Sequence, residues 1–587
     1  MNETFRWINS TLKDDIDFII WTGDSARHDN DEKIPRSEKQ VTTQNELLVQ
    51  KFLEVFGKPD NFDDDDPTND FVIPIVPTFG NNDILPHNIF TEGPNEWTQK
   101  YLRIWQQFIP EAQRHQFARG GWFYVEVIPN QLAVFSLNTL YFFASNSAVD
   151  GCAKKSEPGF EQLEWLRIQL ELLRQRGMKA ILTGHVPPAR VDAKTSWDET
   201  CWQKYALWLK QYRDVIVTSV YGHMNIDHFM VQDFEDIKDH VKKGLAIAEV
   251  SDNEWEDEMS ISAAADYLVG LRSEFAKIPP VVSPFSIDDS SVQQVVLDEV
   301  QSNKKKHKDV EDLLKDIGGP YTERYSISLI GASIVPNYFP SLRVVEYNIS
   351  GLESITLPDY RLPRGDTDEA AEIMKGKKNK KGDHEEHENK KKKKKKKRYK
   401  FTVPQGPSKT APPGPAYSPQ TLTLMGYTNY YANLTYINND FPRMPISGED
   451  DDNLVEDEGW KEGKHKGKAR PSKPKPKEFM FEVEYGTRGD KIYKMEDLTV
   501  RNWLKLARRI AGEKEKRKEN EVDLEKDSKK KKKKKNGKGS KQHEVWYTFI
   551  KRAFVGAKDP QEIEDEFGVY LGLDDDMWDE CEHNLEL

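Results

Sequence analysis

Glycine-centred polar signatures, each placed directly after a short apolar run, constrain the fold of this chain more than any other feature. The runs are Ile16–Trp21, Phe71–Val76, Ala180–Thr183 and Val215–Val220, and the signatures are Gly23-Asp24, Gly80-Asn81-Asn82-Asp83, Gly184-His185 and Gly222-His223-Met224-Asn225. Short apolar runs bounded by turn residues are typical of buried strands, and glycine lets the backbone turn sharply where a strand ends. Because α/β proteins place their chemistry at the carboxyl ends of strands, we expect the side chains that follow the glycines to share one site.

A helix and further strands complete the predicted architecture. After another apolar run, Leu132–Leu137, apolar residues recur every three or four positions, which is typical of one buried helix face; they are Phe160, Leu163, Leu166, Leu170 and Leu173. Gly177 is the expected helix end. Strands that alternate with helices predict a layered α/β domain. We expect Tyr325–Pro336 and Leu342–Ile349 to be strands that complete the sheets.

Much of the chain is too polar to belong to a packed core. Of its 587 residues, 32% are charged, and the mean hydropathy is −0.78. Lysine is gathered in the runs Lys390–Lys397 and Lys529–Lys535, so the net charge of −13 says little about local partners. We expect these runs to be disordered, solvated insertions, and the alternative is that they capture a polyanion.

Changes in composition along the chain predict several segments. Residues 1–235 hold the signatures and form the core, and residues 321–360 supply strands that complete it. The others are an acidic helical insertion (236–320), a lysine-rich insertion (361–410), an apolar and aromatic island (411–446), a charged linker (447–478), a second island (479–512), a second lysine-rich insertion (513–542) and a C-terminal segment (543–587). Because such islands are too short to bury cores of their own, we expect them to pack on the main domain.

The cysteines and the glycosylation sequons give information about the cellular compartment of the protein. Three cysteines exclude a disulfide-rich scaffold; either all are free thiols or one bridge forms, for which Cys152 and Cys201 are the expected pair. Asn-x-Ser/Thr sequons favour a lumenal protein, and they begin at Asn2, Asn9, Asn348 and Asn433, of which the last two are the predicted glycosylation sites. The sequence shows no signal peptide and no run of about 18 apolar residues. A lumenal protein would therefore take its targeting segment from outside this sequence.

The side chains after the glycines have the chemistry of a metal site. Asp24, Asn81, His185 and His223 stand at the strand ends, and His28, Asn82, Asn225 and His228 follow closely. Carboxylate, amide oxygen and imidazole together suit Zn, Fe, Mn or Co. A single Gly-His pair is usually a core or surface histidine, and a single Gly-Asp turn is often only a charged surface turn. Repetition of the pattern after successive apolar runs indicates a metal centre instead.

These motifs resemble those of the calcineurin-like metallophosphoesterase superfamily. The resemblance rests on Gly-Asp, Gly-Asn-x-Asp, Gly-His and Gly-His-x-Asn, and the run Asp24–Asp29 is similar to the acid-sphingomyelinase branch. Longer stretches resemble the endopolyphosphatase family of fungi; they are Trp21–Asp31, Gly80–Ile84, Tyr221–Phe229, Ile334–Pro340, Asp497–Arg501 and Trp546–Tyr547. The resemblance covers residues 5–235, 320–360 and the later islands, and it leaves out the lysine-rich insertions.

The resemblance implies a four-layer α/β/β/α sandwich with two divalent metal ions between the sheets. Such a pair makes a nucleophile of water and holds the phosphoryl oxygens during in-line attack. Asp24 matches the carboxylate that bridges the ions, Asn81 and His185 match ligands of the second ion, and His223 matches a further ligand. Mn, Mg, Co, Zn and Fe are the candidate ions.

The chain departs from the superfamily pattern at its beginning. An Asp-x-His motif that supplies ligands to the first ion is expected upstream of Gly-Asp, but Met1 stands 23 residues before Asp24 and no such motif occurs between them. A truncated gene model or a natural fragment explains this departure and the missing membrane anchor together. A chain that is inactive as written is the alternative.

Two substitutions within the motifs bear on the chemistry. Asn82 stands where many relatives have a histidine acid, which suits a phosphoanhydride substrate because its phosphate leaving group needs little protonation. Asn225 stands where the last motif usually has histidine, and its amide oxygen is expected to bind the first ion and to shift the preference toward Mn or Mg. Asp227 and His228 are expected to support the ligands through hydrogen bonds.

Two further side chains near Asp24 each have two alternative interpretations. His28 either donates a proton to the leaving group or supports the site structurally. Arg27 is the predicted substrate-binding residue, since guanidinium groups suit phosphates, and the alternative is a salt bridge with Asp29 or Asp31.

The leading hypothesis is a metal-dependent endopolyphosphatase that hydrolyses internal phosphoanhydride bonds of inorganic polyphosphate. By resemblance it would lie on the lumenal side of the vacuolar membrane, held by an N-terminal anchor absent from this sequence. A sphingomyelinase-like or nucleotide phosphodiesterase is the alternative, which Asn82 disfavours because an alcohol leaving group needs an acid. A third hypothesis is an inactive, truncated homologue whose lysine runs bind polyanions. No nucleic-acid partner is expected, and the sequence sets no oligomeric state.

Overall fold

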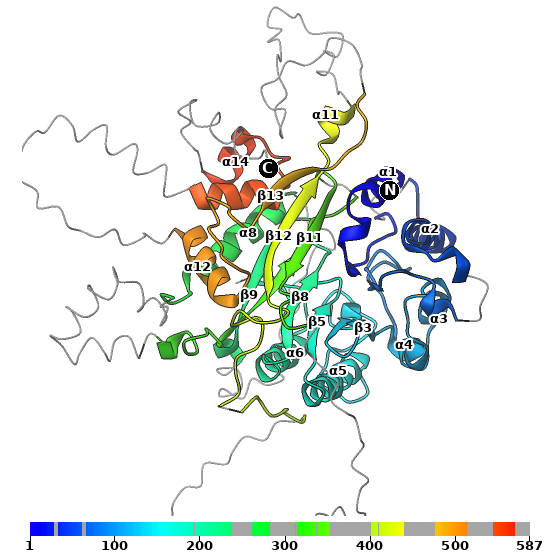
Figure 1. Ribbon diagram of the computed structural model, residues 1–587, viewed down its shortest axis with the longest axis horizontal. Helices are drawn as coiled ribbons and strands as arrows, with labels where there is room; N and C mark the ends of the chain where they lie inside the picture. Colours follow the sequence, from blue (N-terminus) through cyan, green and yellow to red (C-terminus); the bar gives the residue numbers. More distant parts are fainter. Residues whose placement is uncertain are drawn as a thin grey trace, which may run out of the picture.

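The computed structural model describes residues 1–28, 33–61, 66–191, 194–237, 261–281, 312, 314–335, 338–352, 401–408, 410–438, 476–512 and 544–569. Both lysine runs, and with them the predicted disorder of the insertions, lie outside these residues. Figure 1 shows the described part as helices arranged around groups of strands. The predicted α/β class is confirmed.

Within the described residues, a six-stranded mixed sheet carries the third and fourth signatures. Its strand order is β3-β4-β5-β8-β10-β9, in which β4, β5, β8 and β10 are parallel and the edge strands are antiparallel to their neighbours. The strands are Phe123–Ile128 (β3), Leu132–Ser136 (β4), Lys179–Thr183 (β5), Ile216–Tyr221 (β8), His228–Asp233 (β9) and Tyr325–Ile330 (β10). The central strands are largely buried, as parallel strands covered on both faces must be. The prediction that the strand from Tyr325 runs to Pro336 is wrong, because β10 ends at Ile330 where the pairing with β8 and β9 stops.

Smaller sheets lie beside the large one. The parallel pair β1 (Ile19–Trp21) and β2 (Ile75–Pro77) carries the first two signatures, and β11 (Ser341–Tyr347), β12 (Leu424–Tyr431) and β13 (Glu482–Gly486) form an antiparallel sheet. Ser136 on β4 donates a hydrogen bond to the Pro77 carbonyl, 2.6 Å away. The Tyr347 hydroxyl at the end of β11 donates to Asp17 just before β1, also at 2.6 Å. The parallel pair is therefore tied to the six-stranded sheet and to the three-stranded sheet. A further two-stranded sheet is formed by β6 (Arg190–Val191) and β7 (Lys194–Thr195).

Helices cover the sheets in two separate groups. Helices α1 (Asn2–Thr11), α2 (Glu38–Phe56), α3 (Glu96–Ile104) and α4 (Arg114–Gly120) lie on the side of β1 and β2, whereas α5 (Pro158–Gln175) and α6 (Glu199–Gln211) pack on the large sheet (Figure 1). The Trp21 ring on β1 contacts the Phe52 ring on α2, with centroids 5.5 Å apart. The predicted helix is confirmed as α5, and Gly177 follows it with a φ of 70°, a conformation that favours glycine. These sheets and helices agree with the predicted α/β class, and the four-layer order of the sandwich stays a prediction.

The late segments complete the core of the main domain. Helices α8 (Ile261–Ala276), α12 (Val500–Ala511) and α14 (Pro560–Phe567) gather near β9 and β10 (Figure 1). Trp503 on α12 contacts Phe229 on β9 with ring centroids 4.5 Å apart, and Tyr427 and Trp546 belong to the same cluster of buried apolar side chains. The proposed segment boundaries stay a prediction. Within the part of the chain that the structure describes, no helix has the length and apolar character needed to cross a bilayer.

A disulfide and a buried lysine lie together at α6. Cys152 and Cys201 form the expected bridge. The Lys204 side chain is almost completely buried and donates a hydrogen bond to the Cys152 carbonyl, and its ammonium group lies 3.5 Å from the centre of the Phe160 ring. Burial lowers the pKa of Lys204 to about 7, against the opposing attraction of Glu164.

We expect Lys204→Met to flatten the pH dependence of stability. Between pH 7 and about 10.4, where an exposed lysine titrates, the unfolded chain holds a proton on Lys204 that the folded protein has lost, so the stability of the parent rises with pH. The free energy of unfolding of the parent relative to Lys204→Met should rise by about 1.4 kcal/mol per pH unit in this range. Urea unfolding at several pH values measures it. Lys39→Met, at an exposed position on α2, should follow the parent; a Lys204→Met curve parallel to that of the parent contradicts the expectation.

Candidate metal centre

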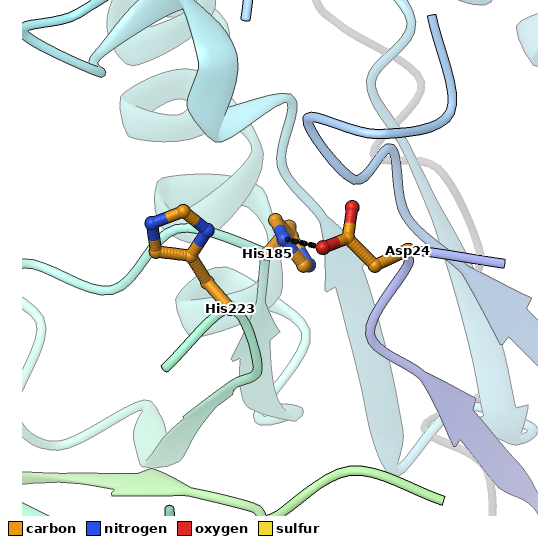
Figure 2. Close-up of side chains that lie close together, drawn as sticks. All are labelled: Asp24, His185 and His223. Atoms are coloured by element: carbon orange, nitrogen blue, oxygen red, sulfur yellow. Dashed lines mark ion pairs between the residues drawn. The ribbon is translucent and has the colours of Figure 1, made fainter. Parts of the chain in front are cut away.

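Predicted ligands from all four signatures meet where β1, β2, β5 and β8 end. Ligand atoms of Asp24, His185 and His223 all lie within 4.8 Å of one another, and Figure 2 shows these side chains pointing toward a common space. Asn81 completes the group, because its Oδ1 lies 2.9 Å from His185 Nε2 and 3.0 Å from His223 Nδ1. One carboxylate, one amide oxygen and two imidazoles around one point are a donor set that fits a divalent metal ion.

The backbone around these donors needs conformations that few sequences allow. Gly80 passes so close to the Asp24 backbone that a Cβ on it would lie 2.1 Å from the Asp24 nitrogen. Asp24 and His223 themselves have left-handed backbones, with φ values of 57° and 68°. Such conformations cost about 1–3 kcal/mol each outside glycine and gather at functional sites. The glycines of the signatures are therefore needed for the close approach of two loops.

The His185 ring is oriented by hydrogen bonds from neighbouring elements. Its Nδ1 donates to the Thr22 carbonyl at 2.6 Å, which directs Nε2 to the site, 3.1 Å from Asp24 Oδ2. The Thr139 hydroxyl accepts from the backbone N–H of His185 at 3.1 Å, which holds the main chain below the ring. A hydrogen bond like that of Nδ1 sets the tautomer and the direction of a metal-binding imidazole.

The electrostatics of the site favour a bound cation. Burial raises the pKa of Asp24, but the charge of His185 and hydrogen bonds from His185 and Asn82 outweigh it, and the net pKa lies below its usual range. Burial lowers the pKa of His223 to about 3, and the charge of His185 acts in the same direction. At neutral pH the site thus offers an ionised Asp24 carboxylate and a neutral His223 imidazole. Burial lowers the pKa of His185, but the charge and hydrogen bond of Asp24 outweigh it and raise the net pKa, so a metal ion would compete with a proton for this ring.

The amide of Asn81 is held so that its oxygen faces the other donors. Its Nδ2 donates to His87 Nε2 at 2.8 Å and to Asn88 Oδ1 at 2.9 Å. Both N–H groups are thereby used, and Oδ1 is directed at His185 and His223. The sequence analysis missed His87 and Asn88, since no apolar run or glycine marks them.

We expect His87→Ala to weaken metal binding without unfolding the protein. The change removes one acceptor that fixes the Asn81 amide, so the amide oxygen is no longer held toward the ion. Loss of such a supporting hydrogen bond typically lowers metal affinity by about tenfold or more. Titration with Mn²⁺, followed by the electron paramagnetic resonance signal of the free ion, measures the affinity. His115→Ala, on an exposed position of α4, is the control; equal Mn²⁺ affinities for the two variants would show that the amide needs no such support.

Asp83 links the loops of the first two signatures. Its buried carboxylate accepts hydrogen bonds from the backbone N–H groups of Asp24 (2.8 Å), Ser25 (2.9 Å), Ala26 (3.1 Å) and Gly80 (2.9 Å) and from Asn45 Nδ2 (3.0 Å). Burial and the charge of Asp24 raise the pKa of Asp83 more than these hydrogen bonds lower it. The Gly-Asn-x-Asp pattern contains Asp83, but the sequence analysis gave it no role.

Comparison with curated proteins decides the family. An endopolyphosphatase from Neurospora crassa is 48% identical over 545 residues, which cover 87% of this chain and 70% of that relative. The chain belongs to the endopolyphosphatase family. Endopolyphosphatases from Saccharomyces cerevisiae and Yarrowia lipolytica are 36% and 33% identical, over 88% and 95% of the chain and 75% and 81% of the relatives. No family model matches the chain. The family resemblance inferred from the motifs is confirmed.

In this endopolyphosphatase-family chain, Asn82 and His28 lie on one side of Asp24. Asn82 donates to Asp24 Oδ1 through its N–H at 2.9 Å and to Oδ2 through Nδ2 at 3.0 Å. The same Nδ2 lies 3.4 Å from His28 Nδ1. Asn82 thus orients the carboxylate and places an imidazole next to it. The Arg27 guanidinium is turned to the carbonyls of His28 and Ile34, and its alternative partners Asp29 and Asp31 lie outside the described residues.

At the end of the fourth signature, Asn225 lies in the same loop as His223, whereas His228 makes its contacts away from the converging donors. Asn225 is half-buried and shares the left-handed backbone of His223, with a φ of 56°; its role as a ligand stays a prediction. The buried His228 ring contacts the Ile226 carbonyl through Nδ1 at 3.0 Å and the Tyr267 hydroxyl on α8 through Nε2 at 3.2 Å. His228 therefore joins β9 to α8, whereas the sequence analysis placed it among residues that support the ligands.

The predicted glycosylation sites differ in exposure. Asn348 is half-buried, and its amide donates to the Gln420 carbonyl at 3.1 Å. Asn433 is 3% exposed and borders a cavity of about 170 Å³. Because a glycan needs an accessible amide nitrogen, the geometry favours Asn348 over Asn433. Both sites stay predictions.

Proposed function

We propose that the chain is a metal-dependent endopolyphosphatase that hydrolyses internal phosphoanhydride bonds of inorganic polyphosphate to give shorter chains. The observation that supports this most is the convergence of Asp24, Asn81, His185 and His223 in a chain whose relatives are named endopolyphosphatases. A carboxylate, an amide and two imidazoles fit a metal-assisted hydrolysis of a phosphate ester or anhydride.

Two divalent ions are part of the proposal. Asn81, His185 and His223 would hold one ion together with Asp24, and Asp24 and Asn225 would contribute to the other. Bound ions activate water and stabilise the charge on the phosphoryl oxygens. Since the set includes amide oxygens, which are hard ligands, Mn or Mg is the preferred metal in this proposal.

Asn82 and His28 have distinct proposed roles. Asn82 cannot donate a proton as an acid, and its two hydrogen bonds to Asp24 make it the residue that orients this carboxylate. His28, next to Asn82, would face the leaving group. The leaving group of a phosphoanhydride is itself a phosphate of low pKa, so the reaction needs little help from an acid.

Arg27 is proposed to act on the substrate through its charge. A polyphosphate carries about one negative charge per phosphate unit, and a guanidinium stays protonated at every physiological pH. The hydrogen bonds of Arg27 to the carbonyls of His28 and Ile34 use part of its donor fork. We therefore expect electrostatic attraction from this position instead of a bidentate clamp on one phosphate.

Incubation with long-chain polyphosphate in the presence of Mn, Mg, Co or Zn tests the proposal, with the products separated on a gel. Progressive shortening to chains of intermediate length supports internal cutting. Release of monophosphate alone would overturn the endo assignment. Cleavage of bis(4-nitrophenyl) phosphate with no attack on polyphosphate would favour the phosphodiesterase alternative.

We further propose that the protein acts on the lumenal side of the vacuolar membrane. The Cys152–Cys201 disulfide supports an oxidising compartment, because disulfides rarely persist in the cytosol, and the sequon at the half-buried Asn348 agrees with lumenal exposure. Fractionation of cells, combined with glycosidase treatment of the recovered protein, tests this location. Recovery of an unglycosylated protein in the cytosolic fraction would exclude it.

A further inference from the structure

A buried carboxylate lies directly behind the fourth signature. Asp227 is two residues beyond Asn225 and four beyond His223, and it is 3% exposed. Its backbone N–H donates to the Ala553 carbonyl at 2.9 Å, at the end of the helix formed by residues 544–553. The loop that carries His223 and Asn225 is therefore held on its C-terminal side by a segment more than three hundred residues away.

The Asp227 carboxylate meets one side chain from each strand of the three-stranded sheet. Arg343 on β11 donates to Oδ1, and Asn429 on β12 and Tyr485 on β13 donate to Oδ2, the last at 2.7 Å. Arg343 pairs with Asn429, and Asn429 pairs with Tyr485, in the strand register. These donors form a row across the sheet, named here the donor row.

The donor row is itself firmly placed. Arg343 Nε donates to Asn429 Oδ1 at 2.9 Å, and the Arg343 guanidinium lies over the Tyr427 ring, 4.0 Å from its centre. The Tyr427 and Tyr485 hydroxyls are 2.8 Å apart, and Arg552 from the helix 544–553 lies over the Tyr485 ring at 4.0 Å. A buried charge with several hydrogen bonds of this kind fixes one geometry, since any shift leaves a charge without its partners.

The loop of residues 222–227, named here the metal loop, needs such support. His223 and Asn225 both have left-handed backbones, which persist only where the surroundings hold them. The first end of the loop continues β8 and the second end leads into β9, and both strands belong to the large sheet. Asp227, the last residue before β9, also contacts the donor row and the Ala553 carbonyl. The loop is thus held by the large sheet at both ends and, through Asp227, by the three-stranded sheet and the helix 544–553.

We propose that Asp227 is a positioning residue for the metal centre, and that the donor row Arg343, Asn429 and Tyr485 sets the direction of the His223 and Asn225 side chains through it. The three-stranded sheet and the helix 544–553 are in this view part of the metal-binding machinery, although they supply none of the four converging donors. The inference rests on the metal site of the proposed function, and it leaves the substrate open.

Tyr485→Phe and Tyr417→Phe form a matched pair that tests the proposal. Tyr485→Phe removes the buried hydrogen bond to Asp227 at 2.7 Å and the contact with the Tyr427 hydroxyl at 2.8 Å. Tyr417→Phe removes one buried phenol hydrogen bond, to the Tyr325 carbonyl at 2.8 Å, at the end of β10 that lies away from the metal loop. Mn²⁺ titrated alone, with no substrate, is the probe. We expect a loss in thermal midpoint in both variants, the larger one in Tyr485→Phe, with Mn²⁺ affinity reduced about fivefold or more in Tyr485→Phe and unchanged in Tyr417→Phe.

Asp227→Asn provides the second variant. It keeps the size of the side chain but replaces one acceptor oxygen with an amide that faces donors, so we expect a larger loss of Mn²⁺ affinity than in Tyr485→Phe, with circular dichroism used to check the fold. If Tyr485→Phe does not fold, Asp227→Asn alone decides the question. The proposal would be overturned if Tyr485→Phe and Asp227→Asn bound Mn²⁺ with the same affinity as Tyr417→Phe. An unaltered chain that binds no Mn²⁺, Mg²⁺, Co²⁺ or Zn²⁺ would instead refute the metal site itself.

Discussion

Replacing Asp24 with asparagine is expected to abolish polyphosphate hydrolysis. Asp24 is the one carboxylate in the converging donor set, and it contacts His185 and both donors of Asn82. An amide offers only one oxygen and no charge, so a metal ion would no longer be held at this position. A metal contribution of several kcal/mol to the transition state corresponds to a loss of about a thousandfold or more in kcat.

The Asp24→Asn experiment needs to separate loss of metal from loss of fold. Asn82 keeps an acceptor in the new amide for one of its two hydrogen bonds, so we expect a folded protein with near-normal thermal midpoint and without Mn²⁺ binding. Asp14→Asn, at an exposed position between α1 and β1, is the matched control and should keep full activity. Activity in Asp24→Asn above a tenth of the parent value would mean that the carboxylate is no metal ligand.

The strand ends and the donors were predictable because their signal is local. An apolar run, a glycine and a polar residue lie within a few positions, and β1, β2, β5 and β8 all match such runs. The capping box at Ser37 and Gln40 and the buried face of α2 were equally local, and the sequence analysis nevertheless missed this helix.

The supporting contacts were not predictable, because they depend on register and on loops far apart in sequence. Arg343, Asn429 and Tyr485 meet Asp227 only because β11, β12 and β13 pair in one register, and a shift by one residue would turn these side chains to the opposite face. The contacts of Asp83 with Asp24 likewise span 59 positions. Composition and periodicity carry no information about either arrangement.

Asp83→Ala is expected to have the largest effect on stability among the substitutions considered. The carboxylate accepts from four backbone N–H groups and from Asn45, and all of these donors are left without it in the variant. Each buried donor that loses its acceptor costs about 1–3 kcal/mol. The raised pKa of Asp83 shows that its own burial is unfavourable, so removing it recovers part of that cost. Because the cost of several donors without an acceptor exceeds the burial cost of one carboxylate, we expect a net loss of about 4 kcal/mol in the free energy of unfolding.

Asp83→Ala should also move the ligands of the metal centre apart. The N–H groups that Asp83 holds belong to the turn after β1 and to Gly80, which keep Asp24 and Asn81 within reach of each other. A destabilisation of about 4 kcal/mol corresponds to a fall in thermal midpoint of roughly 5 °C for a described part of nearly 400 residues, and Mn²⁺ should no longer raise the midpoint. Asp83→Asn keeps one acceptor oxygen and should lie between the parent and Asp83→Ala in both measurements. Asp60→Ala, exposed beyond the end of α2, serves as the control. If Asp83→Ala has the same thermal midpoint as Asp60→Ala and still binds Mn²⁺, the two loops are held together without the carboxylate.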